Sequence, residues 1–451
     1  MTLKFGTDGV RGVANAELTP ELVMALGRAA AHVLGGPTFL VGRDTRVSGP
    51  LLQAALTAGL ASEGVNVRDV GVLPTPAVAA LSAADQLPAA VISASHNSFA
   101  DNGVKLFSSG GRKLSDETER RLEAVLADTL AGGRAADPGA VVGAGVGRLV
   151  TDPGGRGRYQ RGVLESLSGR RLGGLRVVID CANGAASVTA AEVLRHAGAE
   201  LVGVLAAEPN GTNINHGCGS TDPGALQAAI VAQGADVGLA FDGDADRVIA
   251  ADHSGALIDG DQLLAILALD LKQRDLLAGD TVVVTVMTNL GFRLAMRQHQ
   301  VAVHETQVGD RYVLEALNWG RWSLGGEQSG HIIFRELATT GDGLLTGLQL
   351  MDVMVRQDRT LAELARQAMT RQPQVLRNVA VTDARGLDDA VAIWAEVKAV
   401  EAQLGERGRV LLRASGTEPL VRVMVEAPTL EVAETAADRL VEAVEGGLGR
   451  V

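Results

Sequence analysis

The stretch Val91-Ile92-Ser93-Ala94-Ser95-His96-Asn97 joins an apolar strand to small hydroxyl residues and a histidine. A serine at the end of a buried strand lies at the rigid edge of an α/β sheet, where such sheets bind ligands. This placement predicts that Ser95 is a covalently phosphorylated nucleophile and that His96 holds a phosphate oxygen. The same residues also fit a strand-to-helix turn with a capping Ser or Asn, the commoner role of such a segment. The functional interpretation therefore depends on three stretches further along the chain.

Length and composition predict a globular α/β protein with several domains. The chain has 451 residues, more than one hydrophobic core normally supports, so we expect three or four domains. Hydrophobic residues make up 46% of the chain and aromatic residues only 3%, so Ala, Val and Leu must build the cores. Such cores suit strands that are covered by helices.

The net charge and the cysteine content limit the classes of ligand and the cellular compartment that we expect for this protein. The net charge of −12 argues against nucleic acid or an anionic membrane, because the field would repel both, so a phosphate ligand needs a local basic cluster. Cys181 and Cys218 lack metal-ligand spacing and are expected to be reduced thiols. The N-terminus has no signal-peptide core, and no segment offers about 18 unbroken apolar residues, so we expect a soluble, cytoplasmic protein.

The first 150 residues alternate helices and strands, which predicts a mixed or parallel sheet. Gly6-Thr7-Asp8-Gly9-Val10-Arg11-Gly12 is expected to be a loop that brings backbone N–H groups and Arg11 close to a ligand. Lys105, one of five lysines, either serves the same ligand or is a solvated surface residue. The expected elements are helices over 19–35 and from residue 48, and strands over 39–41, 65–70 and 89–92.

A stretch rich in Gly, Ala and Pro over residues 131–158 predicts a domain boundary near residue 150. The second domain repeats the alternation of strands and helices. Its strands are expected over 176–181, 201–205 and 237–241, and its helices over 187–197 and 223–233.

The motif Asp242-Gly243-Asp244-Ala245-Asp246-Arg247 directly follows the strand at 237–241. Carboxylates at every second residue can project to one side of a loop and converge on a hard cation. An EF-hand is excluded, because Arg247 stands where Gly is needed and His253 where Glu is needed. The alternative is a solvated acidic turn, but three unpaired carboxylates would repel one another. We therefore predict a Mg²⁺ site.

Two later loops offer polar groups to a ligand. Gly325-Gly326-Glu327-Gln328-Ser329-Gly330-His331 carries a carboxylate, a hydroxyl and an imidazole, which suit sugar hydroxyls or an amine, although a β-turn with a capping Ser fits equally well. Arg413-Ala414-Ser415-Gly416-Thr417-Glu418-Pro419, with Arg422 behind it, supplies guanidinium, hydroxyl and N–H groups. This cluster suits a phosphate dianion better than a plain charged hairpin.

The remaining elements predict two more domains. The third is expected to begin near Asp259, with a loop over 308–312, and to end before a linker at Gln372-Pro373. The fourth is predicted to pack helices on one antiparallel sheet. The expected helices cover 260–272, 291–299, 346–370, 386–404 and 429–447, and the expected strands cover 281–286, 301–305, 378–382, 410–413 and 420–426.

In this order the motifs resemble the α-D-phosphohexomutase superfamily, and within it the bacterial phosphoglucosamine mutases, over nearly the whole chain. The resemblance implies three similar α/β domains with mixed sheets sandwiched by helices, a smaller C-terminal α+β domain, and an active site in the central cleft. With the boundaries above, residues 1–150 carry the phosphoserine, 151–258 the metal, 259–372 the sugar site and 373–451 a phosphate clamp. The motifs lie at residues 7–12, 93–97, 242–247, 326–331 and 413–419.

The resemblance also implies residue roles. Ser95 is the phosphoserine, and one of its oxygens joins Asp242, Asp244 and Asp246 around Mg²⁺. Glu327 and Ser329 hold the sugar, groups matching Arg11, Lys105 and His331 serve proton transfer, and the phosphate clamp consists of Arg413, Ser415, Gly416, Thr417 and Arg422. The sequence departs from the family at Ser98, where Pro is usual, and at Asp222, where His is expected.

The implied reaction is the reversible conversion of glucosamine 6-phosphate to glucosamine 1-phosphate through a sugar 1,6-bisphosphate, which feeds amino-sugar nucleotide and cell-wall precursor synthesis. Its loose transition state requires alignment and charge neutralisation, which the metal and Arg247 would supply. A phosphomannomutase or phosphoglucomutase would share every chemical group. If the protein were a metal-dependent glycosyltransferase, Ser95 would have no role. If it were a phosphosugar sensor that only binds its ligand, the metal loop would have no role. The oligomeric state, a homodimer included, stays open.

Overall fold

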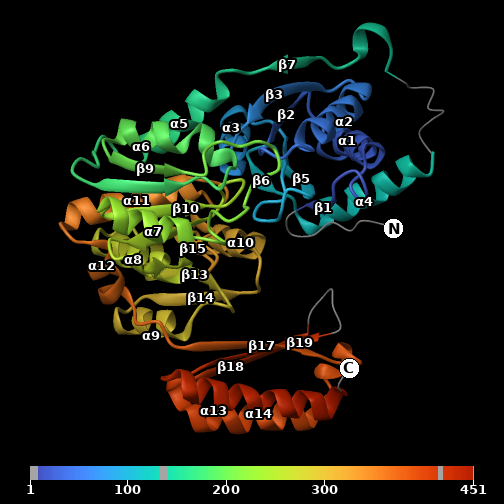
Figure 1. Cartoon of the computed structure of the whole chain (residues 1–451). Coiled ribbons are helices and arrows are strands. Elements are labelled where there is room, and N and C mark those ends of the chain that lie inside the picture. The colour runs from blue at the N-terminus through green and yellow to red at the C-terminus, as the bar shows by residue number, and fades with distance from the viewer. Residues whose placement is uncertain (1–8, 133–140, 415–419, 450–451) are drawn as a thin grey trace. The chain divides into compact units, whose positions relative to one another are not determined.

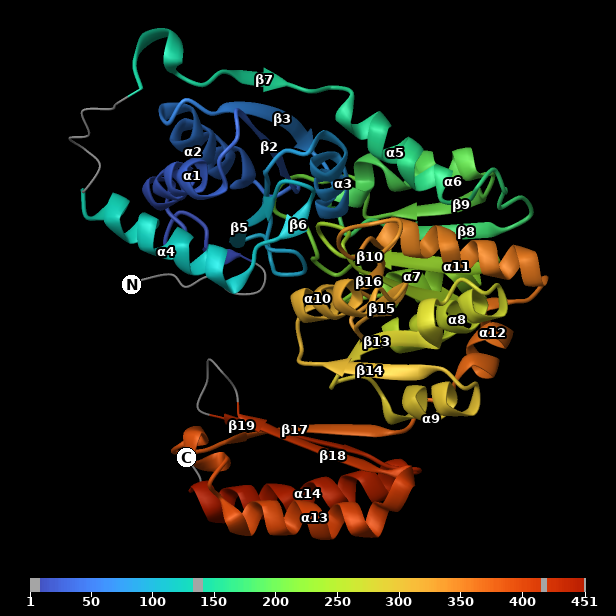
Figure 2. The ribbon, with the colours of Figure 1, turned by 180° about the vertical axis from the view of Figure 1, so that it is seen from behind.

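The computed structural model describes residues 9–132, 141–414 and 420–449. Its residues group into two compact units, the first formed by Met1–Val286 and Ala302–Arg366 and the second by Met287–Val301 and Gln367–Val451. Figure 1 and Figure 2 show the elements from two sides. Three mixed sheets lie in the first unit and one antiparallel sheet in the second, which confirms the predicted fold class of three α/β layers and a C-terminal α+β layer.

The first sheet holds the predicted nucleophile at a strand end. Its strands run in the order β1-β5-β4-β2-β3-β7, with β6 beside β5, and β5 is antiparallel to its neighbours β1 and β4. Buried Val, Leu and Ala side chains of α1, α2 and α4 form a core with its strands. The elements are β1 (Val10–Val13), α1 (Pro20–Leu34), β2 (Thr38–Arg43), α2 (Gly49–Ser62), β3 (Asn66–Val72), α3 (Thr75–Asp85), β4 (Ala89–Ile92), β5 (Asp101–Ser108), β6 (Arg112–Lys113), α4 (Asp116–Leu130) and β7 (Leu149–Thr151).

The second and third sheets each have three strands that pair in parallel on one side and antiparallel pairing on the other side. Their strand orders are β12-β11-β10-β8-β9 and β14-β13-β15-β16. The strands of the second sheet and the helices of the same part of the chain are α5 (Gly155–Glu165), β8 (Arg176–Asp180), α6 (Ala190–Ala197), β9 (Glu200–Leu205), α7 (Gly224–Gln233), β10 (Val237–Phe241), β11 (Val248–Asp252) and β12 (Leu257–Ile258). The strands of the third sheet and the helices of the same part of the chain are α8 (Gly260–Gln273), β13 (Thr281–Thr285), β14 (Ala302–Thr306), α10 (Asp310–Gly320), β15 (Leu324–Gly326), β16 (Ile332–Phe334) and α11 (Gly343–Gln357).

The second unit contains the sheet β17-β19-β18, formed by Gln374–Ala380, Leu420–Glu426 and Arg409–Ala414. Helices α13 (Val391–Leu404) and α14 (Leu430–Leu448) lie side by side on one face of it (Figure 1), and their apolar side chains form its core. Helix α9 (Leu290–Gln298) also belongs to this unit. The buried carboxylate of Glu426 accepts hydrogen bonds from Asn289 Nδ2 (2.9 Å), from the amide of Leu290 (3.0 Å) and from Arg409 Nε (2.9 Å).

Four expectations about local structure were wrong. Val10, Arg11 and Gly12 are not part of a loop but pair with Val104, Gly103 and Asn102 as strand β1. Residues 310–312 are not a loop either, because they begin helix α10. The helix expected over 346–370 is two helices, α11 and α12 (Leu361–Ala368), because Asp358 has a φ of 51° and ends the first. Helices α3, α4 and α5 were not predicted.

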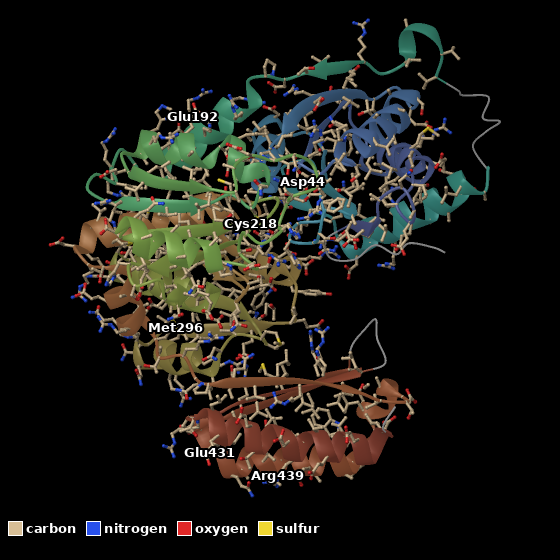
Figure 3. All side chains as sticks on the ribbon, viewed as in Figure 1. Asp44, Glu192, Cys218, Met296, Glu431 and Arg439 are labelled. Carbon is tan, nitrogen blue, oxygen red and sulfur yellow. The ribbon has the colours of Figure 1, made fainter. Side chains whose placement is uncertain are left out.

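The two cysteines are buried free thiols, as expected, and Cys218 is labelled in Figure 3. Burial raises the pKa of Cys181 to about 12 and that of Cys218 to about 11, which makes both thiols inert at neutral pH. Among the described residues, the helices are all too short or too polar to cross a membrane.

Candidate active site

Ser95 lies three residues after the end of β4, in a backbone conformation that is rare for a residue with a side chain. Its φ is 52°, in the left-handed region, so the surrounding contacts must stabilise it. Its amide donates a hydrogen bond to Ser93 Oγ (3.0 Å), and Ser93 Oγ donates to Asp44 Oδ2 (2.7 Å). Asp44, labelled in Figure 3, follows β2 and is fully buried. The predicted nucleophile is therefore held by the end of the neighbouring strand.

The carbonyl groups of the nucleophile loop are fixed from two sides. Arg46 Nη2 and Asn215 Nδ2 each donate to the carbonyl oxygens of Ser95 and Asn97, all at 2.9 Å. The Arg46 guanidinium is 1% exposed and is neutralised by Asp44 at 2.8 Å. Burial raises the pKa of Asp44 despite this partner. Neither donor was predicted from the sequence, although the run Arg43-Asp44-Thr45-Arg46 after a buried strand was a usable signal for Arg46.

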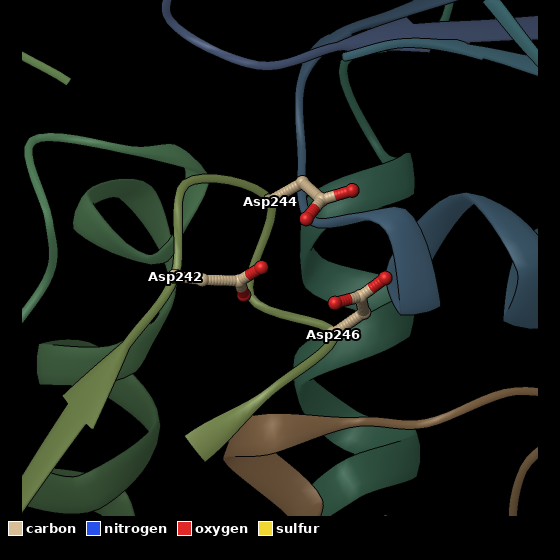
Figure 4. Close-up of side chains that lie close together, drawn as sticks. All are labelled: Asp242, Asp244 and Asp246. Atoms are coloured by element: carbon tan, nitrogen blue, oxygen red, sulfur yellow. The ribbon is translucent and has the colours of Figure 1, made fainter. Parts of the chain in front are cut away.

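The three aspartates of the metal motif lie together on the turn between β10 and β11 (Figure 4). All three are buried, and one ligand oxygen from each lies within 4.8 Å of the others. Asp242 Oδ1 accepts from the amide of Arg247 (3.2 Å), and Asp244 Oδ2 accepts from Thr75 Oγ1 (2.6 Å). The prediction that these carboxylates converge is confirmed.

Lys105 supplies a buried positive charge to this cluster. Its Nζ lies 2.7 Å from Asp244 Oδ2 and 3.1 Å from Asp246 Oδ2, and the residue is 3% exposed. The alternative of a solvated surface lysine is therefore excluded. Burial favours the neutral form of Asp246, but Lys105 outweighs it, with His331 and Arg247, and holds the pKa of Asp246 well below its usual range. Burial, and then repulsion by Asp246 and Asp244, raises the pKa of Asp242 well above its usual range.

One carboxylate oxygen of each of the three aspartates is placed to bind a metal ion. In the part of the chain that the structure describes, Asp244 Oδ1 is buried without a hydrogen-bond partner. Asp246 Oδ1 is also buried without a close hydrogen bond, and it lies 3.8 Å from both His331 Nδ1 and Arg247 Nε. The third outward oxygen, Asp242 Oδ2, accepts a hydrogen bond of 2.5 Å from Ser95 Oγ. Buried carboxylate oxygens without partners are costly, and carboxylate oxygens are the ligands that Mg²⁺ prefers. The residues present therefore fit a hard divalent cation beside Ser95.

His96 lies next to the nucleophile and contacts Arg247. His96 Nδ1 is 3.4 Å from Ser95 Oγ and 3.1 Å from Arg247 Nη1. Burial, and then the positive charges of Arg247 and Arg11, lower the pKa of His96, so the imidazole is neutral near pH 7. Arg11 Nη1 donates to the carbonyl of Ala94 at 3.5 Å, which brings this predicted residue to the same loop.

The predicted sugar loop lies between β15 and β16. Glu327 Oε1 accepts from the amide of Gly309 (3.0 Å), and the Oγ of Ser329 is buried without a hydrogen-bond partner in the described residues. His331 is buried, accepts at Nε2 from the amide of Gly341 (3.0 Å), and turns Nδ1 toward Asp246 Oδ1 at 3.8 Å. This loop therefore reaches the metal motif through His331.

The predicted phosphate clamp lies in the second unit. Arg413 on β18 and Arg422 on β19 are opposite each other in the antiparallel register. Ser415, Gly416 and Thr417 lie outside the described residues. The first unit thus brings together Ser95, His96, Arg11, Lys105, Asp242, Asp244, Asp246, Arg247 and His331.

Comparison with known proteins gives matches over nearly the whole chain. The matching descriptions are "Phosphoglucomutase/phosphomannomutase, alpha/beta/alpha domain I" over residues 2–131, domain II over 158–255, domain III over 259–372, and the C-terminal domain over 376–443. A curated "Phosphoglucosamine mutase" of Rhodococcus opacus (strain B4) is 53% identical over 443 residues, which cover 97% of this chain and 98% of the relative.

Two solved structures share the fold at lower identity. A phosphoglucomutase/phosphomannomutase family protein from Burkholderia thailandensis has a TM-score of 0.81 at 24% identity, covering 99% of this chain and 98% of that chain. Aspergillus fumigatus N-acetylphosphoglucosamine mutase, in complex with GlcNAc-6P and magnesium, has a TM-score of 0.70 at 18% identity, covering 99% of this chain and 96% of that chain.

Proposed function

The chain belongs to the phosphoglucomutase/phosphomannomutase family, and on that premise we propose that it interconverts glucosamine 6-phosphate and glucosamine 1-phosphate. The observation that carries the proposal is the 2.5 Å hydrogen bond from Ser95 Oγ to Asp242, inside a cluster of three buried aspartates. A nucleophile hydroxyl at a cation site is what phosphoryl transfer requires. Relatives at 53% and 52% identity are named phosphoglucosamine mutase, which favours the amino sugar.

The proposed reaction starts from Ser95 that already carries a phosphoryl group. The bond between phosphorus and Ser95 Oγ breaks and a bond to the free sugar hydroxyl oxygen forms. The proton of the sugar hydroxyl passes to a base, and the released Ser95 Oγ takes up a proton to become a hydroxyl. The resulting 1,6-bisphosphate turns around, and its other phosphoryl group returns to Ser95 by the same chemistry. A phosphoserine carries a charge of about −1.5 to −2, so positive groups must face it. Lys105, Arg247 and Arg11 supply them.

Mg²⁺ would be held by Asp242, Asp244 and Asp246 and would neutralise charge on the transferring phosphoryl group. The neutral imidazole of His96 binds a phosphoryl oxygen next to Ser95. Arg11, Lys105 and His331 are the candidates for proton transfer, because all three lie around the nucleophile and the metal motif.

Substrate recognition is assigned to two separate loops. Glu327 and Ser329 bind the sugar, and the unpartnered Oγ of Ser329 is suited to a sugar hydroxyl. Arg413, Ser415, Gly416, Thr417 and Arg422 hold the phosphate that does not react, because they recognise a phosphate whichever carbon bears it. The substrate is then a free hexosamine phosphate in the cytoplasm, and its product supplies amino-sugar nucleotides for cell-wall precursors.

The test is an assay of the purified chain with Mg²⁺ and each hexose phosphate. We expect the highest kcat/KM with glucosamine 6-phosphate, and no turnover after chelation until Mg²⁺ is restored. A phosphomannomutase or phosphoglucomutase is the second candidate, since the matching family descriptions name both activities. A higher kcat/KM for mannose 6-phosphate or glucose 6-phosphate would decide for that candidate.

A further inference from the structure

Thr75, the first residue of α3, holds Asp244 through two hydrogen bonds. Its Oγ1 donates to Asp244 Oδ2 (2.6 Å), and its amide donates to the carbonyl oxygen of Asp244 (2.9 Å). The residue is 1% exposed. Because the first amides of a helix have no partner within the helix, the amide of Thr75 is free to bind this carbonyl. The metal motif is thus attached at Asp244 to the start of a helix from another part of the chain.

These contacts divide the two oxygens of the Asp244 carboxylate between different tasks. Oδ2 accepts from Thr75 and from Lys105, whereas Oδ1 has no hydrogen-bond partner among the described residues. The torsion that rotates a carboxylate is broad, so the side chain alone does not determine which oxygen points outward. The hydroxyl of Thr75, together with the ammonium group of Lys105, removes that freedom.

A hydroxyl is suited to this task because it carries no charge. A second lysine at this place would orient Asp244 equally well, but it would also repel a cation at Oδ1. Thr75 fixes the direction of the carboxylate and leaves its negative charge available. Removal of a residue that forms a hydrogen bond to a metal ligand without contacting the metal typically lowers metal affinity about 10–100-fold.

We propose that Thr75 is a positioning residue that orients Asp244 toward the metal ion. The proposal rests on the Mg²⁺ site of the proposed function. It assigns to Thr75 no contact with the sugar, the phosphate or the metal, so its effect must pass through Asp244.

The test compares Thr75→Val, which keeps the shape and loses the hydroxyl, with Thr75→Ser, which keeps the hydroxyl. The metal-stripped full-length chain is titrated with Mg²⁺ in a calorimeter. We expect Thr75→Val to weaken Mg²⁺ binding about 10–100-fold, and Thr75→Ser to bind within about threefold of the wild type. Thr281→Val is the matched control, because it removes a buried hydroxyl that donates to the carbonyl of Gly279 (2.8 Å), and its Mg²⁺ affinity should be unchanged.

Metal dependence separates positioning from a general loss of structure. Saturating Mg²⁺ should restore most of the kcat of Thr75→Val, whereas a misfolded site would not respond. Thermal unfolding in the presence of a chelator shows whether Thr75→Val folds. If it does not fold, Thr75→Cys takes its place, because a thiol is a weak hydrogen-bond donor of similar size. Thr75→Cys should then bind Mg²⁺ less tightly than Thr75→Ser. Wild-type affinity in a folded Thr75→Val or Thr75→Cys overturns the role of Thr75 alone. Absence of Mg²⁺ binding by the wild type overturns the metal site and this inference with it.

Discussion

Arg413 and Arg422 face each other as a cross-strand pair in the sheet of the second unit. Like charges directly opposite on neighbouring strands destabilise a sheet. Burial, and then the charge of Arg422, lower the pKa of Arg413. An anion between the two guanidinium groups would remove this repulsion. The pair therefore supports the assignment of this hairpin to phosphate binding.

Arg422→Ala should raise KM for the sugar phosphate and release free bisphosphate, while Ser95 stays phosphorylated. One charged hydrogen bond contributes about 1.5–3 kcal/mol, which corresponds to roughly 10–150-fold in KM. Steady-state kinetics and chromatography of the reaction mixture measure both effects. Arg377→Ala is the control, because Arg377 is an exposed arginine on the neighbouring strand β17. Loss of activity with unchanged KM and no free bisphosphate would contradict the clamp.

Ser95→Ala should fold and lose all mutase activity, because the phosphoryl acceptor is gone. Peptide mass analysis of the active wild type should find one phosphoryl group on residues 91–105 and none in the variant. Ser93→Ala is a useful comparison, because Ser93 Oγ accepts a hydrogen bond from the amide of Ser95. This variant should have a lower kcat but should still be phosphorylated on Ser95. A fully active wild type without phosphoserine would falsify the covalent mechanism.

Asp244→Asn should lower Mg²⁺ affinity and kcat together, because an amide is a weaker ligand for a hard cation than a carboxylate. Added Mg²⁺ should restore only part of the rate. Asp236→Asn is the control, because Asp236 is partly buried, accepts a hydrogen bond from the amide of Arg176 (2.8 Å), and precedes β10, the strand that ends at the metal motif. Unchanged Mg²⁺ dependence in Asp244→Asn would remove Asp244 from the metal site.

Asn215→Ala should lower kcat about 10–100-fold and change KM little, because displacement of a reacting group by about 1 Å can cost a factor of 100. The variant loses both hydrogen bonds that Asn215 donates to the nucleophile loop. Asn213→Ala, which removes a donor to the carbonyl of Glu208 in the same segment, should keep its kcat. An equal loss of kcat in both variants would show that the segment, and not the contact with Ser95, is responsible.

Asp342 should make stability depend on pH. Burial raises its pKa from 3.8 to about 6, so the folded protein binds more protons than the unfolded chain between these values. Stability is then lost as pH rises through this window, by about 3 kcal/mol in total. Asp342→Asn keeps an acceptor for the amide of Leu345 and a partner for Tyr159, but it cannot ionise. The free energy of unfolding of the variant, relative to that of the wild type, should therefore be higher at pH 8 than at pH 5.

Urea unfolding at the two pH values measures this difference. Asp280→Asn, at an exposed carboxylate, should leave stability unchanged at both. A constant difference between Asp342→Asn and the wild type from pH 5 to 8 would contradict the raised pKa of Asp342.

Local sequence patterns predicted the parts of the fold that local physics determines. Strands β4 and β10 have the predicted bounds, because each is an apolar run that ends at a motif of polar or glycine residues. Two of the predicted functional motifs, at Ser95 and at Asp242, follow such strands directly, which is where α/β sheets bind ligands. Their chemistry could therefore be inferred before the structure was known.

The contacts that hold these motifs in place carry no local signal. Arg46, Asn215 and Thr75 bind partners that are 49, 120 and 169 residues away in the sequence. Each acts through a hydrogen bond whose geometry depends on how the sheets pack. Strand β1 was missed for the same reason, because Val10 is a strand residue only through its pairing with Val104.

The buried carboxylate of Glu426 constrains how this family can be recombined. A chimera that exchanges residues 373–451 for those of a relative would separate Glu426 from Asn289 and from the amide of Leu290, its two donors at the start of α9. Only Arg409 would travel with it. Grafting residues 287–301 along with the C-terminal segment would keep the donors and the acceptor from one parent. The unit of exchange is therefore discontinuous in sequence, and a single crossover at Gln372-Pro373 would divide it.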